Sequence, residues 1–501
     1  MGKVGKICYD EQLNNTKLML QRLVNIAKNK IFLYMISRYI VYFVQFLTTL
    51  IIAARLGPYY MGIWGFLLLL INYFAQLHFG IANSLNILLV HHKDNSERDK
   101  YIINSLILVF YLSIAVGLFY LYYVLWGIPL FDKYNASKFL VWICIIGILQ
   151  YVNMVAINIF RVKNMLNHVT FSQSIIIIIN FVGVIFLTGE LLIDYLIFGY
   201  ILGNIFIVIL SCTSGCFPRL KAVKINADLQ CEILKKGILL FFYNSCFYFI
   251  ILSIKTIVSN YYSVAEFGLF AFSFSLGQAV MLLIGAFSFI VFPKLIDSFS
   301  STNLDEVKRT IYLVRAGYIT SAHLIVYTAL IVFPLLLVFL PQYQEALTAL
   351  NLISLTTLLD ANSFGFSALL LARNKEKISA QISLFSLLIN IMVGIILAKI
   401  LHVAFSYVIF ATMVTYIFFC FSVVRCGAKL IDINEWSYTL KNAFPVKLLF
   451  PYLIAVIISL FELSSLIFVP LLVCLLLNIE EVKQIISIIN KLLYKPNLID
   501  V

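Results

Sequence analysis

Apolar residues form long unbroken runs along this chain, and polar residues gather between the runs. Fourteen runs, mostly 18 to 30 residues long, are separated by short polar segments. A run of about 20 apolar residues can cross a bilayer as a helix, whereas barrel strands alternate over about ten residues. The pattern therefore predicts an all-α integral membrane protein with about fourteen transmembrane helices. The predicted spans are residues 31–54, 60–90, 101–126, 137–160, 170–189, 191–213, 237–260, 266–293, 311–340, 345–372, 377–399, 402–425, 443–461 and 464–479.

The positive charges sort by side of the membrane. If the loops are assigned alternately to the two sides of the membrane, one side also holds both termini. That side carries all but five of the 36 lysines and arginines, in its loops, in the termini or in the nearby ends of the spans. The exceptions are Arg55, Lys133, Lys138, Lys255 and Lys399. Short loops rich in Lys and Arg remain in the cytoplasm. We therefore expect both termini to be cytoplasmic.

Composition excludes other classes of protein. The chain is 62% hydrophobic and only 12% charged, so bilayer lipid must surround it. Its net charge of +13 is spread over the cytoplasmic loops, without a separate basic domain. That distribution predicts contact with anionic membrane lipid and no nucleic-acid partner.

An internal repeat divides the chain into two similar halves. Tyr60–Phe66 (YMGIWGF) resembles Glu266–Phe272 (EFGLFAF), 206 residues later. The stretch from Arg161 to Val184 similarly resembles the stretch that begins at Arg373. Because each half holds an even number of helices, the two repeats are parallel in the membrane, and a substrate path is expected between them.

The repeat predicts a division into lobes and connecting segments. The predicted division is a cytoplasmic amphipathic segment at 1–30, an N-lobe at 31–213, a cytoplasmic linker at 214–236, a C-lobe at 237–425, an interfacial segment at 426–442, two further helices at 443–479 and an amphipathic cytoplasmic tail at 480–501.

Several motifs at helix ends resemble one family of transporters. They are Arg55–Pro58 (RLGP) with Met61–Trp64 (MGIW), Phe79–Ser84 (FGIANS), Val264–Phe270 (VAEFGLF), Phe292–Leu295 (FPKL), Arg373–Lys375 (RNK) and Ile389–Asn390. In this order, the set resembles the Wzx-type polysaccharide and O-antigen flippases of the MATE-like MOP superfamily. The resemblance covers residues 20–425. An Asp-Arg pair that is common in helix 7 of that family is replaced here by Ile254-Lys255.

The resemblance implies a function. A flippase of this family moves an undecaprenyl-diphosphate-linked oligosaccharide, an O-antigen or capsule repeat unit, across the bacterial inner membrane by alternating access. It implies a multi-pass protein of that membrane, with glycan polymerase and glycosyltransferases as partners in lipopolysaccharide or capsule assembly. The sugar, the coupling ion and the oligomeric state do not follow from the residues.

Ionisable residues within spans are costly and are therefore candidate functional residues. Arg38, Arg55 and Lys255 are predicted to bind the substrate's pyrophosphate, because guanidinium and ammonium groups donate to phosphate oxygens. Asp360 with His323 and His78 are predicted ion-coupling residues. The amides expected to exchange hydrogen bonds with sugar hydroxyls are Gln45, Gln76, Asn83, Asn153, Asn244, Gln278 and Asn351.

Plainer interpretations exist for the same residues. Arg38 and Arg55 could snorkel to the two interfaces, and Lys255 could form a structural salt bridge with Asp360. The histidines could be hydrogen-bonded interior residues, and the amides could join helices.

Other functions remain open on sequence alone. A MATE-type cation or drug exporter would require an acidic cavity, but the ionisable residues in the spans are mainly cationic. A glycan polymerase or glycosyltransferase would require a catalytic cluster on a large outer loop, and the predicted outer loops are short. A passive scaffold in a glycan-assembly complex is a further alternative. We expect a transporter, not an enzyme, with no cofactor and no metal site; Cys212 and Cys216 share a helix face without a histidine or second cysteine pair.

Overall fold

The computed structural model describes residues 30–92, 94–127, 132–218 and 225–494. Within these ranges all regular elements are helical. The first half contains α2 (Lys30–Gln76), α3 (Ile81–His91), α4 (Asn95–Trp126), η1 (Asp132–Tyr134), η2 (Ala136–Phe139), α5 (Leu140–Val162), α6 (Leu166–Phe186) and α7 (Gly189–Thr213).

The second half repeats this order and adds further helices. It contains α8 (Ala227–Tyr261), α9 (Val264–Phe299), α10 (Leu304–Val338), η4 (Pro341–Ala346), α11 (Leu347–Ala361), α12 (Phe366–Ala372), α13 (Glu376–Ile395), η5 (Ile396–Ile400), η6 (Phe405–Tyr407) and α14 (Phe410–Lys429). After it come α15 (Trp436–Ala443), α16 (Val446–Leu460), η7 (Ser464–Leu466), α17 (Val469–Leu477) and α18 (Ile479–Tyr494).

The helices confirm the predicted fold class. In the described part of the chain, nine helices are long and apolar enough to cross a membrane, or up to twelve if each bent pair is one span. One of them, α2, contains the first predicted span and the first part of the second. Between these two parts the backbone leaves the helical conformation, at Gly57 (φ 68°). The seventh predicted span lies in α8, whose apolar part is Ser245–Tyr261. The protein is therefore an all-helical membrane protein.

Two predicted spans are broken where the sequence pattern is continuous. The second span is interrupted between α2 and α3, and the tenth bends by 44° between α11 and α12. Glycines with positive φ lie at both breaks, Gly80 (φ 75°) and Gly365 (φ 87°). The hydrophobic pattern does not reveal these breaks, because the residues on either side are apolar.

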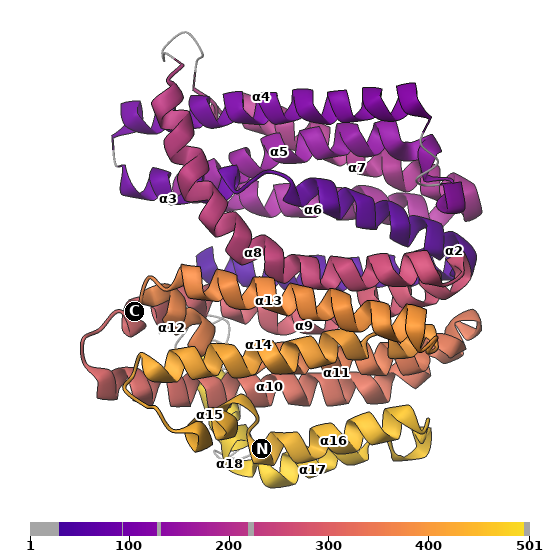
Figure 1. Ribbon diagram of the computed structural model, residues 1–501, viewed down its shortest axis with the longest axis vertical. Helices are drawn as coiled ribbons and strands as arrows, with labels where there is room; N and C mark the ends of the chain where they lie inside the picture. Colours follow the sequence, from indigo (N-terminus) through magenta and orange to yellow (C-terminus); the bar gives the residue numbers. More distant parts are fainter. Residues whose placement is uncertain (1–29, 93, 128–131, 219–224, 495–501) are drawn as a thin grey trace, which may run out of the picture.

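The helices form three groups (Figure 1). Helices α2 to α7 form an N-lobe, and α9 to α14 form the body of a C-lobe. Helix α8 runs obliquely, packing on α3 and α4 near its start and on α13 further along. Helices α16 to α18 lie on the far side of the C-lobe from the N-lobe. We call the helix ends predicted to face the cytoplasm the inner ends, and the opposite ends the outer ends.

The two copies of the repeated motif contact each other at the outer ends. Gly62 lies against the Val264 carbonyl, and Gly268 lies against the Pro58 carbonyl, so that a Cβ on either glycine would overlap backbone. One turn further in, Gly65 packs on Ala271, its counterpart in the repeat. The small residues of the two motifs therefore permit α2 and α9 to cross closely.

Further bonds join the lobes at the outer ends. The Lys133 ammonium donates to the Ser259 and Tyr262 carbonyls, at 2.6 and 2.5 Å. The Tyr343 hydroxyl donates to the Ala53 carbonyl at 3.1 Å. These contacts join the outer ends of the two lobes.

The lobes also meet at the inner ends, through α8. Gly237 of α8 lies against Gly80, and the Tyr101 hydroxyl donates to the Glu232 carboxylate at 3.0 Å. Helix α8 begins at Ala227, so it includes residues that the sequence assigned to a linker.

Arg315 is a buried cation that ties three segments of the C-lobe together. Its side chain is 4% exposed and donates to the carbonyls of Asn362, Phe364 and Asn442, at 2.8, 2.5 and 2.6 Å. The guanidinium carbon lies 4.8 Å from the centre of the Phe366 ring. Arg315 therefore stabilises the break between α11 and α12 and holds α15 against it.

Candidate functional site

A cavity of about 490 Å³ lies between the lobes. Its walls come from α2, α5, α6 and α7 of the N-lobe and from α8 and α9. Three of the predicted substrate-binding residues, Gln45, Lys255 and Gln278, line it. The polar residues that line the cavity are Gln45, Thr48, Thr49, Asn72, Gln150, Asn180, Tyr200, Tyr248, Lys255, Ser275 and Gln278. We call this the central cavity.

The central cavity is positively charged. Lys255 is the one charged side chain among its described lining residues, and no carboxylate lines it. The Lys255 ammonium lies 4.6 Å from the centre of the Phe274 ring, a favourable contact for a cation. Among the described residues no ion pair joins Lys255 to Asp360, so the salt bridge considered above is absent.

Unpaired acceptors face the same region. The Oε1 atom of Gln150 and the Oδ1 atom of Asn180 are buried and accept no hydrogen bond in the described structure. Buried polar atoms normally have a partner, either protein or water. Both residues line the central cavity, and the Asn180 Oδ1 packs against Gly199 of α7. The Gln150 Oε1 therefore remains as the acceptor for a polar ligand or water.

Arg38 lies below the central cavity, toward the inner end. It donates to the Gln173 side chain of α6 and to the Tyr42 hydroxyl, the latter at 2.9 Å. It precedes Gln45 by seven residues, which is roughly 10 Å along a helix. Residues one to two turns beyond Gln173, among them Asn180, also line the cavity. Arg38 therefore joins α2 to α6, the two helices that form one wall of the cavity, at the inner end of that wall.

Arg55 and Gln76 do not line the central cavity. Arg55 is exposed at the outer end, where it donates to the Ile185 carbonyl at 3.2 Å. That bond satisfies a carbonyl in the last turn of α6, a structural role for an arginine at an interface. Gln76 accepts from the Ser245 hydroxyl at 3.3 Å and joins α2 to α8. The Asn244 side chain lies outside the described residues.

The predicted ion-coupling residues come from three places in the fold. His78 is buried at the break between α2 and α3, where its Nδ1 accepts from the Gly80 amide at 2.9 Å. His323 of α10 is 2% exposed; its Nδ1 bonds the Tyr327 hydroxyl at 2.8 Å and its Nε2 has no partner in the described structure. Asp360 is partly buried near the end of α11.

The sequence missed several polar residues that the fold brings together. Asn72, Gln150 and Tyr248 line the central cavity, although each is a single polar residue within an apolar run. Arg315 was also missed as a special residue, because it lies near the inner end of a predicted span and looks like an ordinary interface arginine. Among the described residues no cluster of three or more potential metal ligands occurs.

The fold, but not the sequence, matches known proteins. No protein-family model matches the chain, and no curated protein matches its sequence. A solved structure of the lipid II flippase MurJ in an inward closed conformation matches with a TM-score of 0.63 at 15% identity, over 93% of this chain and 99% of that one.

MATE transporters match over less of the chain. A multidrug resistance MATE family transporter of the MOP superfamily, in an inward-facing conformation, gives a TM-score of 0.60 at 12% identity, over 79% of this chain and 98% of that one. An outward-facing one gives 0.57 at 12% identity, over 80% and 94%. This protein therefore has the fold shared by MATE transporters and the MurJ flippase of the MOP superfamily.

Proposed function

We propose that this protein is a flippase that moves an undecaprenyl-diphosphate-linked oligosaccharide from the inner to the outer leaflet of the bacterial inner membrane. The charge of the central cavity carries the proposal. A cavity between two lobes that has a lysine and no carboxylate favours an anionic substrate. The match to MurJ, which covers 93% of this chain, supports a lipid-linked substrate.

The residues around the cavity have distinct roles in this proposal. Arg38 meets the pyrophosphate at the inner approach, and Lys255 receives it within the cavity, because both donate to phosphate oxygens. Gln45, Gln278 and the unpaired amide of Gln150 bind sugar hydroxyls. Outward movement of negative charge is favoured in a cell that is negative inside, by about 2.3 kcal/mol per charge per 100 mV.

Alternating access fits the contacts between the lobes. The crossing of α2 and α9 at Gly62 and Gly268 joins the outer ends. Separation of this crossing, with the lobes rocking about the central cavity, would open the cavity outward. The small residues allow this close crossing, and among the described residues no ion pair spans it. Outward opening would also break the hydrogen bonds of Lys133 and Tyr343 that join the outer ends.

A MATE-type exporter of cations is the alternative that the fold allows. Its substrates would need a carboxylate in the cavity, and no described lining residue supplies one. The sign of the cavity therefore separates the two functions.

An experiment in cells tests the proposal. Arg38→Glu combined with Lys255→Glu should abolish surface glycan while lipid-linked oligosaccharide accumulates on the inner leaflet, since both changes repel pyrophosphate. Lys235→Glu is the matched control, because Lys235 is an exposed residue of α8 that does not line the cavity. Normal surface glycan in the double variant would refute the proposal.

Ion coupling is a second part of the proposal. His323 has an unpaired Nε2, and Asp360 is an acid near the end of the adjacent helix α11. We propose that a counter-ion binds near these two residues and resets the empty carrier. In proteoliposomes, Asp360→Asn and His323→Gln should remove any dependence of flipping on an ion gradient while downhill flipping persists. Unchanged gradient dependence in both variants would exclude these residues.

A further inference from the structure

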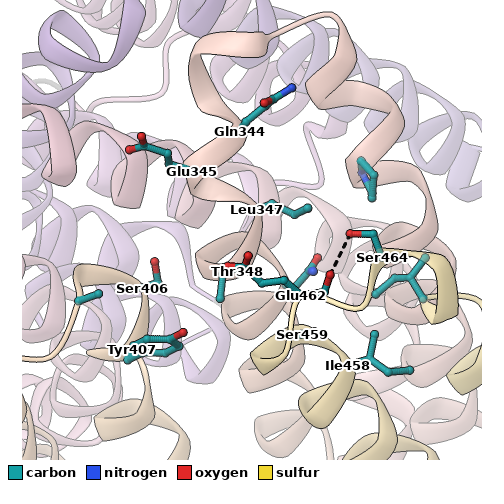
Figure 2. A pocket seen from close by; sticks show the side chains of 14 residues that line it. Gln344, Glu345, Leu347, Thr348, Ser406, Tyr407, Ile458, Ser459, Glu462 and Ser464 are labelled. Carbon is teal, nitrogen blue, oxygen red and sulfur yellow. Dashed lines mark hydrogen bonds between the residues drawn. The ribbon is translucent and has the colours of Figure 1, made fainter.

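A second hollow, the outer pocket, lies at the outer ends, between the C-lobe and the added hairpin of α16 and α17. Its volume is about 460 Å³, within the range of about 300 to 1,000 Å³ typical of small-molecule sites. Figure 2 shows side chains from η4, α11, η6 and the turn after α16 around it. Of the residues predicted to bind the substrate, Asn351 lines it and the others do not.

The outer pocket has the opposite charge to the central cavity. Glu345 and Glu462 line it from different elements, and no Lys, Arg or His is among its described lining residues. Glu462 accepts from the Thr348 hydroxyl at 3.0 Å, which fixes the carboxylate against α11. A phosphate group would be repelled here.

A buried acceptor without a partner also lines the outer pocket. Asn351 is only 5% exposed, and its Oδ1 accepts no hydrogen bond in the described structure. A buried carbonyl oxygen that has lost its water is costly unless a ligand or water donates to it. The Asn351 Oδ1 is therefore an acceptor that a donor group of a ligand, or a water, would satisfy at this wall.

The hydrogen-bond acceptors around the outer pocket would suit a ligand that has many hydrogen-bond donors. Two carboxylates and an amide oxygen are available as acceptors, Glu345 and Asn351 from η4 and α11 and Glu462 from the turn after α16. The several hydroxyl groups of a sugar would supply donors to these acceptors. The Tyr407 ring, also in the lining, offers an apolar surface to a sugar face.

We propose that the outer pocket binds a sugar unit of the glycan as it emerges on the outer side. The inference rests on the proposed function, because the glycan is that of the lipid-linked substrate. Glu462 and Glu345 accept from hydroxyl groups in charge-assisted bonds, and Asn351 accepts at the buried wall. The diphosphate stays outside this acidic site, so sugar and phosphate are held apart.

Binding of free oligosaccharide tests the inference. The full-length protein in lipid nanodiscs is mixed with the repeat unit released by hydrolysis from the strain's own surface polysaccharide, and binding is followed by saturation-transfer NMR. Asn351→Leu and Glu462→Gln should each weaken binding about tenfold, the loss expected when one charge-assisted or buried bond is removed. Glu480→Gln, at an exposed carboxylate outside the pocket, is the matched control and should bind as the native protein does.

The outcomes separate this inference from the proposed function. If surface glycan depends on Arg38 and Lys255 but the repeat unit does not bind, or binds equally to the Asn351 and Glu462 variants, only the pocket inference fails. Binding of Ca²⁺ that needs Glu345 and Glu462, without sugar binding, overturns it in favour of a cation site. If loss of the gene leaves surface glycan unchanged, the proposed function fails and the inference fails with it. Should Asn351→Leu not fold, Glu462→Gln decides the question, because Glu462 is exposed.

Discussion

The central cavity and the outer pocket are similar in size and opposite in charge. The first measures about 490 Å³ and has Lys255 as its charged residue; the second measures about 460 Å³ and has two glutamates. The first lies between the lobes, whereas the second lies within the C-lobe and its added hairpin. A substrate with an anionic diphosphate and a neutral, hydroxyl-rich glycan has one part suited to each.

The charges of the two hollows bear on the choice of substrate, which the fold alone leaves open. MATE transporters and MurJ share this architecture, so architecture does not select a substrate. Charge within the cavity does select, because charges in a low-dielectric cleft act over long distances. The difference in charge between the central cavity and the outer pocket therefore says more about the substrate than the fold of the two lobes does.

The largest expected effect concerns where the two hollows face. Gln344 lines the outer pocket, and a cysteine placed there should react fully with an impermeant thiol reagent in intact cells, because the charge pattern puts it outside. A cysteine at Asn226, just before α8, should not react until the cells are opened. Labelling of both positions in intact cells would reverse or abolish the proposed orientation.

Loss of Arg315 should damage the outer pocket more than the central cavity. Arg315 binds the carbonyl of Asn442 near the end of α15, the helix that leads into α16, and α16 forms one wall of the outer pocket. Arg315→Leu leaves three carbonyls without their donor, at about 1–3 kcal/mol each, and should lower the unfolding temperature. Arg315→Lys should recover part of the loss. Sugar binding at the outer pocket that survives Arg315→Leu unchanged would contradict this arrangement.

Reversal of charge in the outer pocket should slow surface display without abolishing it. Glu345→Lys with Glu462→Lys removes two acceptors and would hold the diphosphate at the exit, so surface glycan should fall about tenfold. The measurement is the amount of surface polysaccharide per cell at equal protein levels. A loss as complete as that in the Arg38 and Lys255 double variant would show that the two hollows do not have separate roles.

The smallest expected effect is at Arg38. Arg38→Lys retains the charge and loses the planar fork that binds Gln173 and Tyr42, so transport should fall only a few-fold. Arg38→Gln should be clearly worse than Arg38→Lys. Equal transport by both variants would indicate that the positive charge at the inner approach is not used.

The sequence predicted the spans and the two repeats for clear physical reasons, and the structure adds that the repeated motifs contact each other. Long apolar runs are needed to cross lipid, and small residues at the repeated motifs permit close crossing, as Gly62 and Gly268 show. The Ile254-Lys255 sequence also identified the cation that lines the central cavity.

Other parts of the sites could not be predicted. Glu345 and Glu462 lie 117 residues apart, and their meeting depends on how the hairpin of α16 and α17 docks on the C-lobe. Arg55 was predicted to bind substrate at the outer end. It instead bonds to the end of α6, because the rotation of α2 about its axis decides which way the side chain points. Neither the hydropathy of the chain nor the number of charges in each loop predicts the rotation of α2.

A comparison of how an anionic and a cationic ligand bind to the central cavity tests the central claim. The protein in nanodiscs is titrated with a lipid-linked diphosphate oligosaccharide and, separately, with ethidium as an organic cation, for the native chain and for Lys255→Glu. We predict that the native protein binds the diphosphate and not ethidium, and that Lys255→Glu loses diphosphate binding by at least about a hundredfold, as expected for a reversed charge close to the ligand. Binding of ethidium by the native protein, with diphosphate binding indifferent to Lys255, would contradict the account and favour a cation exporter.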